Sequence, residues 1–268
     1  MSLISLKFLS FLKNVVRTSN WIINVLSACL IISACDKKAD PEVLVCFVST
    51  RVSNGTSYSY TYENEKLTTI NLSQGTYKTT YKISDNDQGN IFKVTYEAGD
   101  YDKFTYDANH NLLFKEYFHA DGVLYSLTAF EYNNFGQRIK MQIYGNSKAG
   151  SPFNVKGSYE VLEYSNNVTK NPVKFKGYSS LDVPTFVAEL TYDDKKPVYN
   201  RINSFIDLSG FYGLVENNVT KEIVYFPDGS LFDTAVWTYE YNDFGYPTKA
   251  TVISHNGTTT ETYEYDCK

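Results

Sequence analysis

The sequence repeats one short pattern along most of its length, and this pattern strongly limits the folds that the chain can adopt. In each copy, aromatic residues alternate with polar ones and end in a tyrosine, an Asp, Asn or Gly turn follows, and an apolar or lysine-containing segment comes next, as in Phe130–Ile139. The copies recur at a spacing of about 25 residues, which is the length of a supersecondary repeat. The tyrosines that end them are Tyr62, Tyr81, Tyr106, Tyr132, Tyr164, Tyr192, Tyr241 and Tyr265.

The gap between Tyr192 and Tyr241 is far longer than the others in this series. A gap of this length predicts two units instead of one. The turn-like segment Tyr225–Gly229 stands between them and would mark the division.

Within each copy, the residues beside the aromatics are Thr, Ser, Glu or Lys. Alternation with a period of two places the rings on one face of a strand and the polar groups on the other, so each copy reads as a half-buried β-hairpin. Dipeptides that favour short hairpin turns support this interpretation because they tolerate positive φ. They are Asn54-Gly55, Asp121-Gly122, Asp228-Gly229 and Asn256-Gly257. Counting turns predicts roughly 14 to 16 antiparallel strands in sequence order.

A flat sheet of so many strands would expose its aromatic face to water. We therefore expect an all-β antiparallel meander that curls into a barrel or partial barrel, with a fold into two layers as the alternative. The composition of 24 Tyr and 17 Phe against 2 Trp and 2 Met favours strands. An outer-membrane barrel is a further alternative, but it needs a lipid-facing apolar band about ten residues long in every strand. Both faces here are rich in Thr, Lys, Glu and Asn.

The first residues have the organisation of a secretory leader. A basic segment over residues 1–20 precedes the uncharged stretch Trp21–Ala34, which is too short to span a bilayer as a helix. The stretch ends in Ile32–Cys35, which resembles the bacterial lipobox, a motif whose cysteine is acylated before cleavage. We predict a lipoprotein signal peptide over residues 1–34 and lipidation of Cys35.

A second tetrapeptide, Leu26–Cys29, matches the same motif. The apolar run continues beyond it through Leu30–Ile32, whereas Cys35 is followed at once by the charged Asp36. The charge step therefore favours Cys35.

After the leader, residues 35–42 form a lipidated tether and residues 43–268 form one β domain. Asp36 resembles an inner-membrane retention signal of enteric bacteria, while the charged residues after Cys35 resemble export signals of Bacteroidetes-type surface lipoproteins. We expect a cell-envelope protein held by its lipid anchor in the outer membrane, on either the periplasmic or the surface face.

The Tyr-x-Tyr-Asp-x-x-Gly unit resembles the YD repeat of RHS-type proteins. In this lipoprotein setting the chain is similar to an uncharacterised Bacteroidetes family with a porin-like β-fold, and the resemblance covers residues 43–268. Some copies depart from the motif, because the segments after Tyr164 and Tyr192 lack its glycine. The resemblance implies an architecture and no particular activity.

Two cysteines of the mature chain, Cys46 and Cys267, stand at the two ends of the repeat array. Pairing of the first strand with the last would bring them together, and an exported location permits a disulfide. Two buried thiols remain the alternative, since the sequence alone does not fix connectivity.

Residues that could bind a metal are scattered. No two of His110, His119 and His255 have metal-ligand spacing. The segment Asp85–Asn90 resembles a calcium loop but lacks the downstream bidentate glutamate, since Glu97 comes too early. It reads better as a loop whose side chains cap their own backbone. We predict no metal site and no cofactor.

The net charge of the chain limits the classes of molecule that it could bind. The leader carries Lys7, Lys13 and Arg17 and no acid, so its removal takes the net charge from −5 to −8. An acidic surface argues against nucleic-acid binding.

Aromatic side chains are candidates for glycan binding. Tyr58, Tyr60 and Tyr62 form a same-face ladder, and Trp237 is a further candidate, although aromatics at this spacing are usually core residues. Separately, Asp233-Thr234-Ala235 resembles the acceptor of Bacteroidetes-type O-glycosylation, which makes Thr234 a candidate glycan site.

No nucleophile motif or phosphate loop is present in the sequence. The function that we expect is that of a monomeric, non-enzymatic envelope lipoprotein. It would bind a glycan, a protein or another envelope component through the turns at one end of the curled sheet. The alternatives are a carbohydrate-active hydrolase with acidic residues inside the sheet, an outer-membrane barrel and a structural spacer.

Overall fold

The computed structural model describes residues 45–145, 154–166, 169–198 and 215–268. The leader, Cys35 and the tether lie outside the described residues. Within the described part, no helix is long and apolar enough to cross a membrane.

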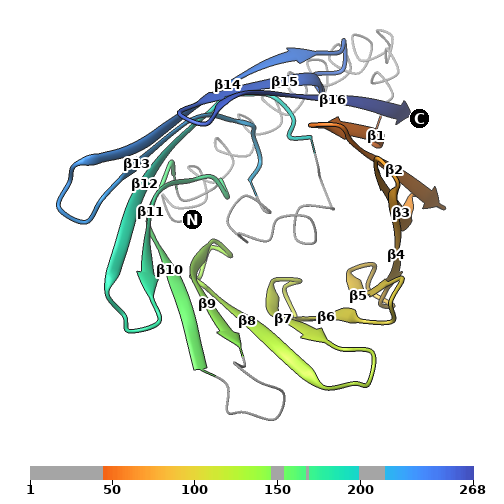
Figure 1. Ribbon diagram of the computed structural model, residues 1–268, viewed down its shortest axis with the longest axis horizontal. Coiled ribbons are helices and arrows are strands. Elements are labelled where there is room, and N and C mark those ends of the chain that lie inside the picture. Colours follow the sequence, from red (N-terminus) through yellow and green to blue (C-terminus); the bar gives the residue numbers. More distant parts are fainter. Residues whose placement is uncertain (1–44, 146–153, 167–168, 199–214) are drawn as a thin grey trace, which may run out of the picture. The chain divides into compact units, whose positions relative to one another are not determined.

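Sixteen strands make up the regular structure of the described residues. They are β1 (Cys46–Ser53), β2 (Thr56–Glu63), β3 (Lys66–Gln74), β4 (Tyr77–Asp85), β5 (Ile91–Tyr96), β6 (Tyr101–Tyr106), β7 (Leu112–Phe118), β8 (Leu124–Tyr132), β9 (Arg138–Gly145), β10 (Asn154–Tyr164), β11 (Pro172–Ser179), β12 (Pro184–Tyr192), β13 (Val219–Tyr225), β14 (Leu231–Tyr241), β15 (Pro247–Ser254) and β16 (Gly257–Cys267). Each strand pairs antiparallel with its neighbours in sequence, and β16 pairs with β1, which closes a barrel (Figure 1). The predicted all-β meander is confirmed, and it is a closed barrel.

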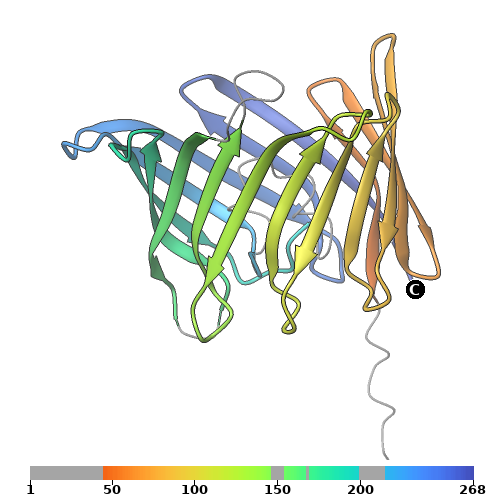
Figure 2. The ribbon, with the colours of Figure 1, turned by 90° about the horizontal axis from the view of Figure 1, so that it is seen from below.

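Because every connection joins neighbouring strands, loops gather at two ends of the barrel (Figure 2). We call the end that follows the even-numbered strands the Asx end, because most of its loops begin with Asp or Asn; it includes residues 86–90, 107–111, 133–137 and 242–246. The opposite end follows the odd-numbered strands and includes residues 97–100, 119–123, 180–183 and 226–230. The chain enters β1 and leaves β16 at the Asx end.

The two faces of the sheet differ in burial. Val94 is 0% exposed, and Ile70 and Met141 are each 1% exposed. Side chains converge on the concave face of a barrel and diverge on its convex face, so this buried face points inward, with alternate residues pointing out. The tyrosines and the other apolar residues of the core cluster lie on the inner face.

Tyrosine hydroxyls fasten the hairpins on this inner face. In seven of them, a tyrosine near the end of an even-numbered strand donates a hydrogen bond to a main-chain carbonyl oxygen near the start of the preceding strand. The pairs are Tyr62 to Val48 (3.0 Å), Tyr106 to Ile91 (2.8 Å), Tyr132 to Leu112 (2.9 Å), Tyr164 to Arg138 (2.5 Å), Tyr192 to Pro172 (2.7 Å), Tyr239 to Val219 (2.7 Å) and Tyr265 to Pro247 (2.8 Å). We call these residues the clamp tyrosines.

Two of the tyrosines expected to end a repeat do not make this contact. In β14 the clamp is Tyr239, and Tyr241 instead reaches Asp193. Tyr81 lies in the middle of β4, opposite Ile70 and Tyr96. Tyr241 ends β14 before the loop 242–246, as the repeat predicts, whereas Tyr81 does not end its strand.

The prediction of two units between Tyr192 and Tyr241 is wrong. β12 pairs directly with β13, so the described residues of this interval form the single hairpin β13–β14, and residues 193–218 connect β12 to β13. The turn Tyr225–Gly229 belongs to the opposite end of that hairpin. The prediction counted the length of this connection as a repeat, because spacing alone does not distinguish a connection from a hairpin.

Most loops at the Asx end are closed by their first side chain. In the loop 133–137, Asn133 Oδ1 accepts hydrogen bonds from the main-chain nitrogens of Phe135 and Gln137, both at 3.0 Å. Gly136 donates to the Asn133 carbonyl oxygen at 3.0 Å and has a φ of +73°, a conformation that favours glycine. This geometry accounts for the Asx and Gly positions of the repeat.

The short-turn predictions divide into two groups. Asn54-Gly55 forms a two-residue loop with φ values of +48° and +76°, as a tight hairpin requires. Asp121-Gly122 and Asp228-Gly229 lie instead within five-residue loops, closed by hydrogen bonds such as His119 N to Val123 O at 3.0 Å. Their aspartates accept main-chain hydrogen bonds inside the loop, so the same dipeptide suits a longer turn.

Two side-chain interactions, a disulfide and an ion pair, join β1 to β16 at the seam where the barrel closes. Cys46 and Cys267, paired in register, form a disulfide with an S–S distance of 2.02 Å. Further along β1, the Arg51 guanidinium forms an ion pair with Glu261 at 2.6 Å, and the side chains are 17% and 20% exposed. Burial opposes ionisation of Glu261, but hydrogen bonds and the Arg51 charge outweigh it and lower the pKa of this carboxyl.

Candidate functional site

The aromatic residues suggested as a binding platform lie on the inner face, in two separate places. Tyr60 is 6% exposed, Tyr62 is a clamp tyrosine, and the Tyr58 ring lies 5.2 Å from the Arg51 guanidinium carbon. Trp237 packs against the core from β14, which β1, β16 and β15 separate from β2 around the barrel. The three tyrosines of the ladder thus have packing partners within the barrel, and Trp237 does not lie beside them.

Thr234 lies on the outer face of β14, opposite Ile223 of β13. The neighbouring Asp233 accepts a hydrogen bond from the Thr234 main-chain nitrogen at 2.7 Å and lies 2.7 Å from Nδ1 of His255. The hydrogen bond to His255 is the main cause that lowers the pKa of Asp233.

The other expected polar residues also have local partners. In the segment Asp85–Asn90, Asn86 Oδ1 accepts hydrogen bonds from the main-chain nitrogens of Gln88 and Asn90, as expected for a self-capping loop. His110 contacts Asn90, and His119 contacts Asp100 rather than the nearby Asp121. Among the described residues, no group of His, Cys, Asp or Glu is arranged to hold a metal ion.

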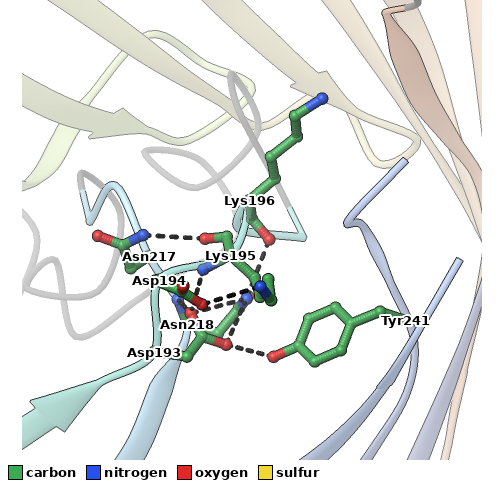
Figure 3. Close-up of polar contacts among 7 residues, drawn as sticks. All are labelled: Asp193, Asp194, Lys195, Lys196, Asn217, Asn218 and Tyr241. Carbon is green, nitrogen blue, oxygen red and sulfur yellow. Dashed lines mark hydrogen bonds and ion pairs between the residues drawn. The ribbon is translucent and has the colours of Figure 1, made fainter. Parts of the chain in front are cut away.

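A polar network surrounds Asp193 at the Asx end, where the long connection leaves β12 (Figure 3). Asp193 Oδ1 accepts hydrogen bonds from the main-chain nitrogens of Lys195 and Asn218, both at 3.0 Å, and Oδ2 accepts one from Asn218 Nδ2 at 3.1 Å. The Tyr241 hydroxyl also donates to Oδ2. Asn218 reaches the Lys196 carbonyl oxygen at 2.9 Å as well.

These contacts occupy both carboxylate oxygens of Asp193. The side chain therefore joins the two ends of the connection 193–218, and Tyr241 ties them to β14. Burial and the bond to Asp193 raise the pKa of Tyr241, which keeps it a hydrogen-bond donor. The network is explained by its role in holding the connection.

A second network, at the opposite end of the barrel, joins the hairpins β5–β6 and β7–β8. Asp100 ends the loop 97–100, and its carboxylate accepts hydrogen bonds from the Tyr117 hydroxyl at 2.5 Å and the Ala120 main-chain nitrogen at 2.8 Å. His119 Nδ1 lies 3.7 Å from the same carboxylate. One aspartate thus holds the two neighbouring loops together.

Behind Asp100, a buried ion pair lies on the inner face. Asp102 is 1% exposed and accepts a hydrogen bond from the Tyr96 hydroxyl at 2.5 Å. Lys115 Nζ, on the next strand, lies 3.5 Å from Asp102 Oδ2, and its side chain is 16% exposed. It is the second ion pair on this face, beside that of Arg51 and Glu261 at the seam.

Aromatic rings continue the network toward the end of the barrel. Tyr96 and Tyr117 meet edge to face with ring centroids 5.9 Å apart, and Tyr125 meets Tyr117 in the same way at 6.0 Å. The His119 ring is 5.0 Å from Tyr125. We call Tyr96, Asp100, Asp102, Lys115, Tyr117, His119 and Tyr125 the rim cluster.

The electrostatics of the rim cluster favour the charged form of Asp100 and the protonated forms of Tyr96 and Tyr117. The hydrogen bond from Tyr117 is the main cause that lowers the pKa of Asp100, and the same bond raises the pKa of Tyr117 to about 12. Burial, followed by the charge of Asp102, raises the pKa of Tyr96. The cluster therefore offers carboxylate acceptors together with neutral aromatic rings near neutral pH.

Sequence reasoning missed the rim cluster, although one signal was present. Alternation along β6 places Asp102 on the same face as Phe104 and Tyr106. A charged residue on an otherwise apolar face needs a partner and is therefore a mark of a special site. The partner Lys115 comes from another strand, and the sequence does not identify it.

Comparison with known proteins agrees with the architecture. No protein-family model matches the chain, and no curated protein matches its sequence. A solved porin-like protein from Bacteroides uniformis is similar, with a TM-score of 0.53 and 17% identity over 84% of this chain and 96% of that chain. A porin-like protein from Bacteroides vulgatus has a TM-score of 0.45 and 10% identity over 83% of this chain and 99% of that chain.

Part of the Photorhabdus luminescens Tc holotoxin pore is also similar, with a TM-score of 0.30 and 12% identity over 78% of this chain and 8% of that chain. The chain thus shares a barrel fold with the porin-like protein of Bacteroides uniformis.

Proposed function

We propose that the chain is a monomeric cell-envelope lipoprotein, anchored in the outer membrane through Cys35, whose barrel stands in water and binds an envelope ligand without acting as an enzyme. The observation that carries the proposal is the charge on the outer face. Four cross-strand ion pairs lie on it: Lys103 with Glu116, Lys140 with Glu131, Lys174 with Glu189, and Lys249 with Glu240.

A barrel that spans a membrane needs an apolar band on this outer face. Lysine or arginine facing lipid at the middle of a bilayer costs about 2 to 4 kcal/mol each. The paired charges of Lys174 and Glu189, with side chains 38% and 41% exposed, suit water instead. This favours a barrel held at the membrane by an anchor over the alternative of an outer-membrane barrel.

The distance from the anchor to the barrel is short. Residues 36–45 separate Cys35 from β1, and an extended segment of that length reaches at most about 35 Å. A barrel tethered through Cys35 would therefore work close to the membrane surface.

The inner face supports binding better than hydrolysis. Its acids Asp102 and Glu261 each face a cation and a tyrosine hydroxyl. A glycosidase needs two carboxylates placed across the sugar, one of them available to donate a proton. Asp102 and Glu261, each held by a cation and by a tyrosine hydroxyl, are poorly placed to donate that proton.

The anchor is tested by labelling cells with radioactive palmitate. We expect label in the wild type and in Cys29→Ala and no label in Cys35→Ala. Label lost only in Cys29→Ala would move the cleavage site, and an unlabelled wild type would contradict the lipoprotein proposal. Protease shaving of intact cells then shows whether the barrel faces outward.

The water-facing barrel is tested separately. Residues 36–268, produced without the leader, should stay in solution without detergent after high-speed centrifugation. A requirement for detergent would instead support a barrel that spans the membrane.

A further inference from the structure

We propose that the rim cluster is a binding site for a neutral sugar residue of a glycan chain. This inference rests on the proposed function as a binding module and names its ligand class and its site. It is argued from three features: the way the two hairpins are joined, the exposure of the rings, and the buried charges behind them.

The first feature is that the cluster is a fixed structure. Asp100 bonds to both Tyr117 and Ala120 across the two hairpins, and a Cβ on Gly99 would come within 3.1 Å of the Ala120 Cβ. The two loops are therefore in direct contact. A site held in this way needs little ordering when a ligand binds, which lowers the entropic cost of binding.

The second feature is the exposure of the outermost rings. Tyr125 is 43% exposed, and the side chain of His119 is 41% exposed. A β-bulge between β7 and β8 leaves Tyr125 as the extra residue of its strand, and its ring meets those of Tyr117 and His119. Bulges commonly re-aim a side chain at a functional site.

The exposed Tyr125 ring differs from those of the clamp tyrosines. Their hydroxyls bond to main-chain carbonyls and their rings pack against the core. The fold thus accounts for the clamp tyrosines, and it gives Tyr125 no comparable role.

The third feature is the ion pair of Asp102 and Lys115. An ion pair buried in this way commonly stabilises a protein less than apolar residues of the same volume would. On the neighbouring hairpin β8–β9 the inner face carries Phe130 and Met141 at facing positions. In β6–β7 the corresponding facing pair is Phe104 and Lys115, so Lys115 takes the place that the apolar Met141 has on β9, and folding alone does not require a charge at this position.

Together these groups match the surface of a neutral sugar. A sugar ring has an apolar face of C–H groups, which stacks on an exposed aromatic ring, and a rim of hydroxyls that donate and accept hydrogen bonds. Asp100, with a side chain 27% exposed, offers the acceptor, while His119, with a side chain 41% exposed, offers a donor. Two carboxylates against one lysine give this site a negative balance, which disfavours an anionic sugar or a phosphate.

The test measures binding of neutral hexasaccharides to the full mature chain by calorimetry, with a panel built from glucose, mannose, galactose or xylose. We expect at least one to bind, and we expect Tyr125→Ala to weaken that binding about tenfold or more, which corresponds to about 1.4 kcal/mol. Asp100→Asn, which keeps the side-chain size, should also weaken it.

The matched control is Phe135→Ala, because Phe135 is an aromatic residue 64% exposed in a loop at the Asx end. Its affinity should stay within about twofold of the wild type. Circular dichroism and thermal unfolding of each variant show whether the barrel is intact.

Three results would overturn the inference. If no hexasaccharide binds to the wild type, the ligand class is wrong. If one binds and an intact Tyr125→Ala barrel binds it equally well, the site is wrong. If the wild type captures an envelope protein and no sugar, the glycan inference fails while the proposed binding module stands.

Discussion

At the scale of single residues, a clamp tyrosine has two roles that phenylalanine could not combine. Its ring packs on the inner face, and its hydroxyl satisfies a carbonyl oxygen beside a strand end, where ladder hydrogen bonds stop. Tyr192, for example, reaches the carbonyl oxygen of Pro172 at 2.7 Å. A buried carbonyl left without a donor costs about 1 to 3 kcal/mol, which explains why the repeat ends in tyrosine.

Replacement of one clamp hydroxyl should lower stability measurably. We expect Tyr192→Phe to reduce the free energy of unfolding by about 1 to 2 kcal/mol, because it keeps the ring and removes the donor to Pro172. Denaturant unfolding gives the value. The control is Tyr77→Phe at a tyrosine that is 60% exposed, where the change should stay within about 0.5 kcal/mol. Equal losses in both variants would refute a special role for the clamp.

At the scale of elements, the sequence predicted the features that depend on neighbouring residues of one strand and missed those that depend on contacts between strands. Alternation of ring and polar side chain lies within each strand, so the hairpins and the barrel could be predicted. The length of a loop depends on the register of its strands and on side-chain capping. Asp-Gly and Asn-Gly dipeptides reveal neither, so the five-residue loops and the long connection 193–218 were missed. The rim cluster was missed because Asp102 and Lys115 meet only when β6 pairs with β7.

The seam between the first and last strands should depend on its disulfide. Cys46 and Cys267 are 221 residues apart, and chain entropy assigns such a loop a stabilisation of up to about 5 kcal/mol. We expect Cys46→Ser with Cys267→Ser to lower the unfolding midpoint in urea and to leave the β-sheet spectrum of the folded protein intact, since β1 and β16 remain paired by their main chains. An unchanged midpoint with and without reductant would show that the bond does not constrain the unfolded chain.

At the scale of the whole molecule, the buried tyrosines make the barrel sensitive to alkali. Burial is the main cause that raises the pKa of six clamp tyrosines, among them Tyr164, whose pKa rises to about 12; the six are Tyr62, Tyr106, Tyr164, Tyr192, Tyr239 and Tyr265. The folded chain therefore holds these protons above pH 10, where the unfolded chain releases them. Stability is fully present below pH 10 and is lost as the pH rises toward the folded-state values.

A series of denaturant titrations between pH 8 and pH 12 tests this directly. We expect nearly constant stability up to about pH 9.5 and then a fall of as much as about 1.4 kcal/mol per pH unit for each buried tyrosine. Phenolate absorbance of the clamp tyrosines should rise together with unfolding. If all 24 tyrosines ionised near pH 10 in a folded barrel, their burial would be refuted.

The disulfide at the seam also has a mechanical consequence. Cys46 is the first residue of β1, so any tension that the upstream chain exerts on the barrel arrives at this residue. Without the bond, tension would peel β1 away from its two neighbours one hydrogen bond at a time. With the bond, the load passes at once to Cys267 and into β16, so two strands on opposite sides of the seam share it. The covalent link thus lets the joint between the first and last strands serve as the point of attachment.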